Sequence, residues 1–239
     1  MKLKSGFLLV LFTVFMGYSA LAQNITIQPD RPDQTDGTYT IPVHNFQLEE
    51  GVTFSENSTM NNFMLRYGLF HATEVRLSLD AGKTFGRRGL QPIDLSVKQR
   101  IVQQNSLLPA IAVLGNLSYN QWASKDFRTN QISYGVKLAF ENTISDQWSI
   151  GYNIGTAEAF NTLDVTFEIG YSPIQHLATF LEYFSTFSDG SPQHNIDLGA
   201  MYLLQKNIQI DFALGRSIFA AHQRLFATCG ISYWFVNIN

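Results

Sequence analysis

Apolar and polar residues alternate along most of the chain after residue 45. Within residues 130–141, the side chains at even positions from Ile132 to Phe140 are apolar, whereas most of the side chains between them are small or polar. Residues 147–155 and 163–171 repeat this pattern. Because successive side chains of a strand point to opposite faces, a period of two predicts β-strands with one apolar face each. The chain after residue 22 shows no period of 3.6 residues, which would be typical of an amphipathic helix.

Twelve segments of this kind follow one another along the chain. They span residues 45–54, 61–69, 74–82, 92–102, 109–119, 130–141, 147–155, 163–171, 176–185, 194–204, 208–216 and 225–236. The connections after even-numbered segments are short, whereas those after odd-numbered segments are mostly longer and more polar. A transmembrane barrel that begins and ends on one side of the membrane has this asymmetry, with tight periplasmic turns and longer outer loops. Both faces of the ninth segment are mostly apolar, so its register stays open.

The two faces of these segments differ in charge. The apolar rows contain two charged residues, Glu50 and Arg216, and a charge at the centre of a lipid-facing surface costs about 2–4 kcal/mol. The opposite rows hold Arg66, Glu74, Arg76, Asp80, Asp94, Lys98, Arg100, Lys137, Glu168, Glu182, Asp197 and Asp211. A soluble β-sandwich has the inverse arrangement, with its apolar face inside. Aromatic residues gather near both ends of the segments, as they do at membrane interfaces. We therefore predict an all-β fold, a transmembrane antiparallel up-and-down β-barrel of about 12 strands.

The N-terminus has the three parts of a secretory signal peptide. Lys2 and Lys4 precede the apolar stretch 6–16, and Ala20 and Ala22 occupy the small-residue positions of a cleavage site. A secreted barrel with a lipid-facing exterior is expected in the outer membrane of the cell. We predict a signal peptide at residues 1–22, a periplasmic lead-in at residues 23–44 and an outer-membrane β-barrel at residues 45–239.

Composition and motifs exclude several function classes. The 239 residues carry a net charge of −3, so nucleic acid is not an expected partner. Cys229 is the single cysteine, which rules out an intrachain disulfide and a cysteine-based zinc site. The five histidines are dispersed and no Gly-rich phosphate loop occurs, so we expect no metal and no cofactor. Ser191, His194 and Asp197 have a spacing compatible with a triad. The motif G-x-S-x-G is absent, however, and we expect no catalytic residues and no enzymatic activity.

The inward-facing charges are sorted along the chain. The early group is mainly basic and the late group is acidic, and the candidates for lining the lumen are Arg66, Arg76, Asp94, Lys98, Arg100, Lys137, Glu168, Glu182, Asp197 and Asp211. In a ring of twelve strands the early strands face the late ones, so these groups can form an ion-paired network across the lumen. Alternatively, each group contacts lumen water or a same-side neighbour such as Glu74 or Asp94. The sequence leaves both arrangements open.

Residues 24–42 are rich in Pro and Thr and show no alternation. One hypothesis places this segment in the periplasmic mouth as a plug, with Arg31 and Asp33 capping the lumen. The other is an extended, solvated lead-in, which the sequence alone favours slightly.

Several motifs resemble those of a known family. The chain carries the run Asp30-Arg31-Pro32-Asp33-Gln34-Thr35-Asp36 and then Tyr39-Thr40-Ile41-Pro42 and Phe46-Gln47-Leu48-Glu49. Later matches are Leu65-Arg66-Tyr67-Gly68-Leu69, Glu74, Arg76, Leu181-Glu182, Asp197, Gly199, Gln209, Asp211 and Gly215. On these residues the chain resembles an outer-membrane β-barrel transporter family akin to the MetA-pathway of phenol degradation proteins. Asp36-Gly37 departs from the Glu-Ser that is usual there, and the chain continues through 236–239 past the terminal aromatic residue typical of such barrels.

The resemblance implies a porin-like channel or transporter for a small molecule, with hydrophobic or aromatic compounds as one candidate class. The alternative is a closed structural or adhesive outer-membrane barrel without transport activity. The outer loops are short, which argues mildly against an adhesive role. The expected partners are outer-membrane lipids and a small-molecule substrate that the sequence does not name.

Overall fold

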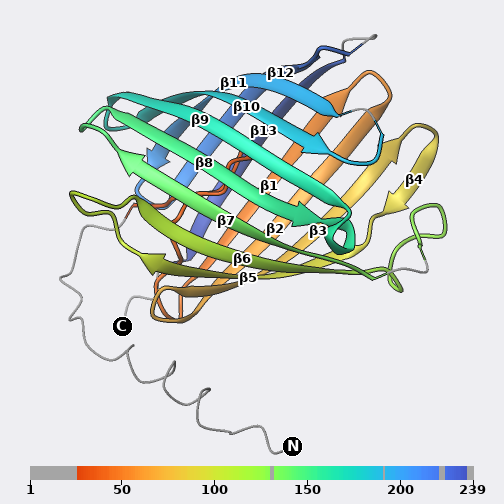
Figure 1. Ribbon diagram of the computed structural model, residues 1–239, viewed down its shortest axis with the longest axis horizontal. Helices are drawn as coiled ribbons and strands as arrows, with labels where there is room; N and C mark the ends of the chain where they lie inside the picture. Colours follow the sequence, from red (N-terminus) through yellow and green to blue (C-terminus); the bar gives the residue numbers. More distant parts are fainter. Residues whose placement is uncertain (1–25, 130–131, 191, 221–223, 236–239) are drawn as a thin grey trace, which may run out of the picture.

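A ring of antiparallel strands surrounds a central space in the computed structural model (Figure 1). The structure describes residues 26–129, 132–190, 192–220 and 224–235, so the predicted signal peptide and residues 236–239 lie outside the described part. The strands are β1 (Phe46–Ser55), β2 (Ser58–Phe70), β3 (Thr73–Thr84), β4 (Arg87–Leu90), β5 (Ile93–Val102), β6 (Ala110–Tyr119), β7 (Ser133–Thr143), β8 (Trp148–Ala157), β9 (Thr162–Ile174), β10 (Leu177–Phe187), β11 (Gln193–Gln205), β12 (Ile208–Ile218) and β13 (Leu225–Phe235). A short 3₁₀ helix, η1 (Glu158–Phe160), precedes β9.

Pairing of the first and last strands closes the ring. β1 pairs with β2 on one side and with β13 on the other, where Phe46 lies opposite Phe235. β3 pairs with both β2 and β5, so β4 stands outside the ring and twelve strands form the barrel. The predicted twelve-stranded antiparallel barrel is therefore confirmed. Among the described residues, no helix has the length and apolar character needed to cross a membrane.

β4 is an element that the alternation pattern missed. β3 extends to Thr84, and β4 folds back onto its last four residues, where the sequence pattern indicated only a loop. Phe85 and Gly86, between the two strands, both have positive φ angles, 46° and 84°. A two-residue hairpin turn of this hand matches the twist of its strands, and glycine adopts such a φ without strain.

The apolar rows lie on the outside of the barrel. Ile132 and Leu198 are 62% and 61% exposed, and Tyr134, Phe167 and Ile210 also lie on the outer surface. The inner rows are polar and buried, including the fully buried side chains of Arg66, Lys98 and Glu74. Glu182 points inward and Leu181 outward, which sets the register that the sequence left open for β10. An exterior of this kind fits hydrocarbon and not water, and the barrel lies in the outer membrane.

The segment before β1 lies inside the barrel (Figure 1). Ile27 donates its backbone N–H to the carbonyl of Lys206 at 2.9 Å, in the turn between β11 and β12. His44 donates to the carbonyl of Gly68 at 2.8 Å, near the turn between β2 and β3. Both ends of the segment therefore lie at the end of the barrel with the short turns, which is the periplasmic end. We call residues 26–45 the plug segment. Thr35, Thr38, Thr40 and Ile41 of this segment are buried, in contrast to the solvated lead-in that the sequence slightly favoured.

Candidate functional site

Four cations from β2, β3, β5 and β7 line one side of the lumen. Arg66 on β2 and Arg76 on β3 lie directly opposite each other in the sheet, and Lys98 on β5 and Lys137 on β7 follow around the ring. We call these four residues the basic wall. Like charges at such close range repel, so this arrangement needs carboxylates to be stable.

Two of the required carboxylates belong to the barrel itself. Arg66 binds Glu74 through two parallel hydrogen bonds of 3.0 Å and contacts Glu49 at 2.8 Å. The Nε of Arg76 lies 2.6 Å from Glu74. The planar guanidinium suits such two-pronged binding of a carboxylate. The side chains of Glu49 and Glu74 are both fully buried.

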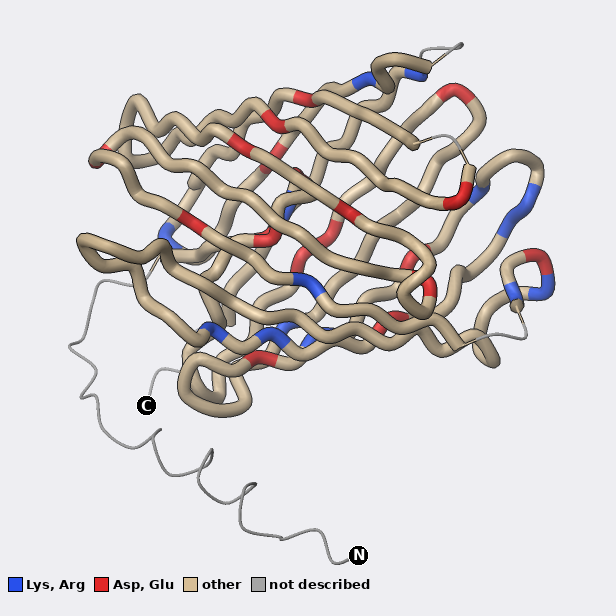
Figure 2. Tube along the Cα trace, in the orientation of Figure 1, with Lys and Arg blue, Asp and Glu red and all other residues tan. Residues whose placement is uncertain are grey.

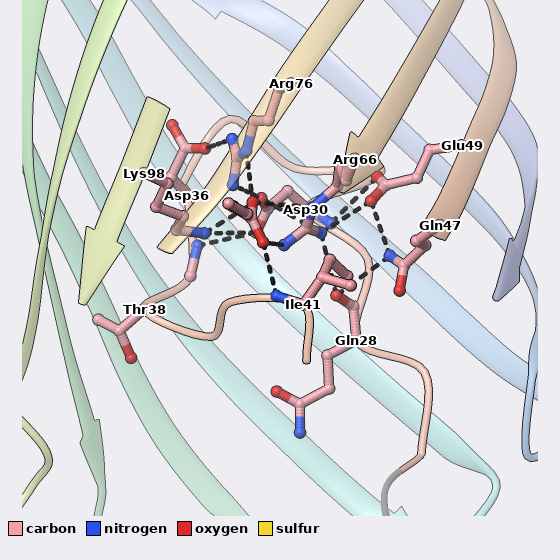
Figure 3. A network of polar contacts seen from close by, with 12 residues as sticks. Gln28, Asp30, Asp36, Thr38, Ile41, Gln47, Glu49, Arg66, Arg76 and Lys98 are labelled. Atoms are coloured by element: carbon pink, nitrogen blue, oxygen red, sulfur yellow. Dashed lines mark hydrogen bonds and ion pairs between the residues drawn. The ribbon is translucent and has the colours of Figure 1, made fainter. Parts of the chain in front are cut away.

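The plug segment supplies the other two carboxylates (Figure 3). Asp30 lies within ion-pair distance of three wall cations: 3.4 Å from Arg66 and 3.2 Å from Lys98, with Arg76 in closer contact. Asp36 lies 2.8 Å from Arg76 and 2.6 Å from Lys137. Burial on its own would raise the pKa of Asp36, but the nearby cations lower it well below its ordinary value overall. Asp36 is therefore ionised throughout the physiological pH range.

The opposite side of the lumen is acidic (Figure 2). Its carboxylates come from four consecutive strands, and we call them the acidic wall: Glu168 on β9, Glu182 on β10, Asp197 on β11 and Asp211 on β12. The plug segment meets this wall mainly with hydrogen-bond donors. Glu182 accepts a 2.9 Å bond from the backbone N–H of Gln34 and a 2.6 Å bond from the hydroxyl of Thr35. The hydroxyls of Thr35 and Thr166 are 2.7 Å apart.

Asp33 of the plug segment also lies among the acids of this wall. Burial, with the neighbouring carboxylates of Glu168 and Glu182, raises the pKa of Asp33 well above its ordinary value. The carboxylates of Asp33 and Glu168 lie close enough to repel each other when both are ionised, and a proton on Asp33 relieves this repulsion. Among the described residues, no Lys, Arg or His nitrogen lies within 4.0 Å of either carboxylate.

Arg31 is the one cation that the plug segment carries to the acidic wall. Its Nη2 lies 3.3 Å from Asp211 and 3.0 Å from the hydroxyl of Thr228. The guanidinium lies flat against Gly51 of β1 and Gly230 of β13, where an added Cβ would overlap it. These glycines allow the close approach of the plug to the barrel wall.

The lining residues expected from the sequence divide into two groups. The plug segment brings six of them together: Arg66, Arg76, Lys98, Lys137, Glu182 and Asp211. Of the other four, Glu168 lies beside Asp33 and Asp197 beside Glu182. Asp94 contacts Ser118 on β6, and Arg100 has no ion pair among the described residues. Among the described residues, no direct ion pair joins the early strands to the late ones, because a ring of twelve strands is wider than two facing side chains can span. Each wall is instead bridged to the plug segment.

Arg31 and Asp33, expected as caps of the periplasmic mouth, lie deeper, against the inner wall. The sequence reasoning missed Asp30, Asp36 and Glu49 as members of the site, although all three belong to motifs of the family resemblance. The sequence feature that marks them is the high density of charged residues at positions 30–36, within a segment that shows no alternation of apolar and polar residues. A charged segment that cannot form a strand needs counter-charges elsewhere.

The triad considered from sequence spacing does not form. His194 is on the outer face, where its Nδ1 lies 2.8 Å from the hydroxyl of Tyr183 and 2.9 Å from that of Ser185. Asp197, three residues further along the same strand, points to the lumen, because positions an odd number apart face opposite sides. Ser191 lies outside the described residues. In the described part of the chain, no group of three His, Cys, Asp or Glu side chains is placed to hold a metal ion.

Solved structures of outer-membrane barrels share this fold. The COG4313 outer membrane channel from Pseudomonas putida F1 is 11% identical, with a TM-score of 0.67, and the match covers 87% of this chain and 100% of that chain. The KdgM porin is 12% identical, with a TM-score of 0.62 over 80% of this chain and 99% of that one. The NanC porin is 7% identical, with a TM-score of 0.60 over 79% and 98%. No curated protein sequence matches the chain.

The family resemblance seen in the sequence has an independent counterpart. The family model described as "Putative MetA-pathway of phenol degradation" matches residues 29–235, which include nearly all of the plug segment and the entire barrel. The chain belongs to this family of outer-membrane barrels.

Proposed function

We propose that the protein is an outer-membrane channel for small molecules, and that the plug segment controls passage through it. One observation carries this proposal: the plug occupies the lumen without being part of the sheet. Between its two ends, the backbone N–H groups of Asp30, Gln34, Asp36, Thr38 and Ile41 donate to side chains of the wall and not to strand carbonyls. Such bonds can be exchanged for water, so the plug can leave while the barrel stays intact.

The plug leaves some open space beside it in the lumen. A cavity of about 160 Å³ lies between the plug segment and the wall formed by β7, β8 and β9, with Tyr39, Glu141 and Glu168 among its lining residues. This volume admits a few water molecules. A larger solute therefore needs the plug to move.

Different observations favour two different classes of solute. The family resemblance suggests hydrophobic or aromatic molecules, whereas the charges of the two walls favour polar, charged ones. The KdgM porin, which is similar in fold, has been solved in complex with disordered oligogalacturonate. This ligand is a property of that porin. Liposome-swelling assays that compare phenol, neutral sugars and charged sugars of matched size separate these classes.

A closed structural barrel is the second candidate, and one observation favours it. Six ion pairs join the plug segment to the walls among the described residues, and the side chains that form them are largely buried. Removing one partner of such a buried pair costs several kcal/mol, so the plug can serve as permanent filling of the lumen.

A reversible lock on the plug distinguishes the two candidates. Thr35→Cys and Thr166→Cys replace two hydroxyls that touch, and Cys229→Ala removes the native thiol. We expect low conductance in planar bilayers while the disulfide is formed and clear opening events after reduction. The single variant Thr35→Cys, in the same background, is the control and should not respond to reductant. Equal conductance of the oxidised and reduced double variant would favour the closed barrel.

A further inference from the structure

The basic wall has a charge imbalance that the barrel does not correct. Glu49 and Glu74 of the barrel form ion pairs with Arg66 and Arg76, and Asp164 of the barrel lies near Lys137 without forming an ion pair. Asp30 and Asp36 of the plug segment complete the balance, and Figure 3 shows these carboxylates among the wall cations. The plug therefore acts on this wall as a pair of carboxylates held at fixed positions.

Arginine cannot relieve the imbalance by losing its proton. The guanidinium groups of Arg66 and Arg76 stay charged at every physiological pH. Glu49 and Glu74 stay with these two arginines when the plug leaves, so the cations that lose their carboxylate partner are Lys98 and Lys137. The acidic wall differs, because its carboxylates can take up protons and become neutral. A bound anion would keep Lys98, Lys137 and the two arginines paired, whereas the acidic side can become neutral by taking up protons.

We propose that the basic wall is a binding site for small dicarboxylate molecules, and that the plug segment occupies this site in their place. The inference rests on the proposed function, because the site opens only when the plug is displaced. Arg76 contacts both Asp30 and Asp36, so the two carboxylates of the plug lie on either side of one guanidinium. A dicarboxylate with a short spacer, such as glutarate, can present its two groups in the same way.

The test removes the plug's two carboxylates without removing the plug. In Asp30→Asn/Asp36→Asn, purified as the full chain, we expect glutarate to bind about tenfold or more tightly than to the unmodified protein in calorimetric titrations near pH 7. Glutaramide, which has the same length and no charge, should bind neither protein. The matched control is Asp33→Asn, which makes the same chemical change in the same segment but faces Glu168 and Glu182. Glutarate binding to this control should stay as weak as in the unmodified protein.

Two outcomes would overturn the proposal: no gain in glutarate affinity in a folded double variant, or an equal gain for inorganic phosphate, which would indicate simple counter-ion neutralisation. Heat-modifiable migration on a gel reports whether the double variant folds. If it does not fold, Thr40→Cys in a Cys229→Ala background supplies the measurement, because Thr40 is buried in the plug segment. Glutarate, unlike glutaramide, should speed labelling of this thiol several-fold, and equal labelling rates would reject the site.

Failure of this proposal is separable from failure of the proposed function. If the disulfide lock shows that the plug moves but glutarate binds no variant, the channel stands and the dicarboxylate site falls. If the lock has no effect on conductance but glutarate binds the double variant, the channel falls and the site stands.

Discussion

Glycine at two wall positions allows the single arginine of the plug segment to reach its carboxylate. Arg31 lies over Gly51 and Gly230, and its guanidinium reaches Asp211 on the next strand. A methyl group at either position would occupy the space of the guanidinium. The pairing of Arg31 with Asp211 therefore depends on residues that form no bond themselves.

Gly51→Ala is expected to displace Arg31 and leave Asp211 without its partner. We expect a loss of roughly 1–3 kcal/mol in the free energy of unfolding, the cost of an unsatisfied buried polar group. Reversible denaturant titration in lipid vesicles measures it. Gly115→Ala is the matched control, because a Cβ there meets nothing within 4 Å. Equal stability of the two variants would show that Arg31 does not need this close approach.

The twelve barrel strands could be predicted from the sequence because the solvent on their outer face is uniform. Every strand repeats the alternation of apolar residues facing lipid and polar residues facing the lumen. The predicted strand ends differ from the observed ends by at most three residues, as at Ser58 and Ile174. The plug segment could not be predicted in the same way. Its side chains meet partners from eight different strands, so no period marks its buried positions. Asp30 and Arg31 are adjacent in sequence but bind opposite walls.

The plug segment should respond to pH through Asp33. The pKa of Asp33 is raised from its ordinary value of 3.8, mainly by burial, so its stabilising contribution is complete at low pH and is lost as the pH rises through the raised pKa. The groups that face it are Glu168 on β9, Glu182 on β10 and Asp30 of the plug, all of them acidic. Asp36 acts in the opposite direction: its contribution is present above its ordinary pKa and is lost only in strong acid. A rise in pH through the raised pKa of Asp33 is therefore expected to loosen the plug.

Labelling of Thr40→Cys, in the Cys229→Ala background, measures this release. After correction for the ionisation of the thiol, the labelling rate should rise by up to about tenfold per pH unit once the pH exceeds the pKa of Asp33. Adding Asp33→Asn should flatten this dependence, because the amide does not ionise. A pH dependence that persists with Asp33→Asn would assign it to the wall carboxylates and contradict the role given to Asp33.

The barrel reverses the arrangement of a soluble protein: its core is charged and its surface is apolar. Fully buried Arg66, Lys98 and Glu74 lie inside, whereas Leu198 and Leu204 are 61% and 51% exposed. One lipid-facing charge is accommodated locally, because Glu50 accepts a hydrogen bond from Asn61 on the neighbouring strand. This hydrogen bond offsets part of the cost of placing the Glu50 carboxylate on the lipid-facing surface.

Two outward leucines of β11 test this arrangement at different depths. Leu198 lies near the middle of the strand and Leu204 next to its periplasmic end, and both are exposed. Leu198→Arg should lower the free energy of unfolding from lipid vesicles by about 2–4 kcal/mol, whereas Leu204→Arg should cost about 0–1 kcal/mol. Water would solvate an arginine equally at both positions, so a lipid exterior is the reason for the difference. Equal small effects would mean that the Leu, Ile and Tyr rows do not face hydrocarbon, and the outer-membrane placement would fail with them.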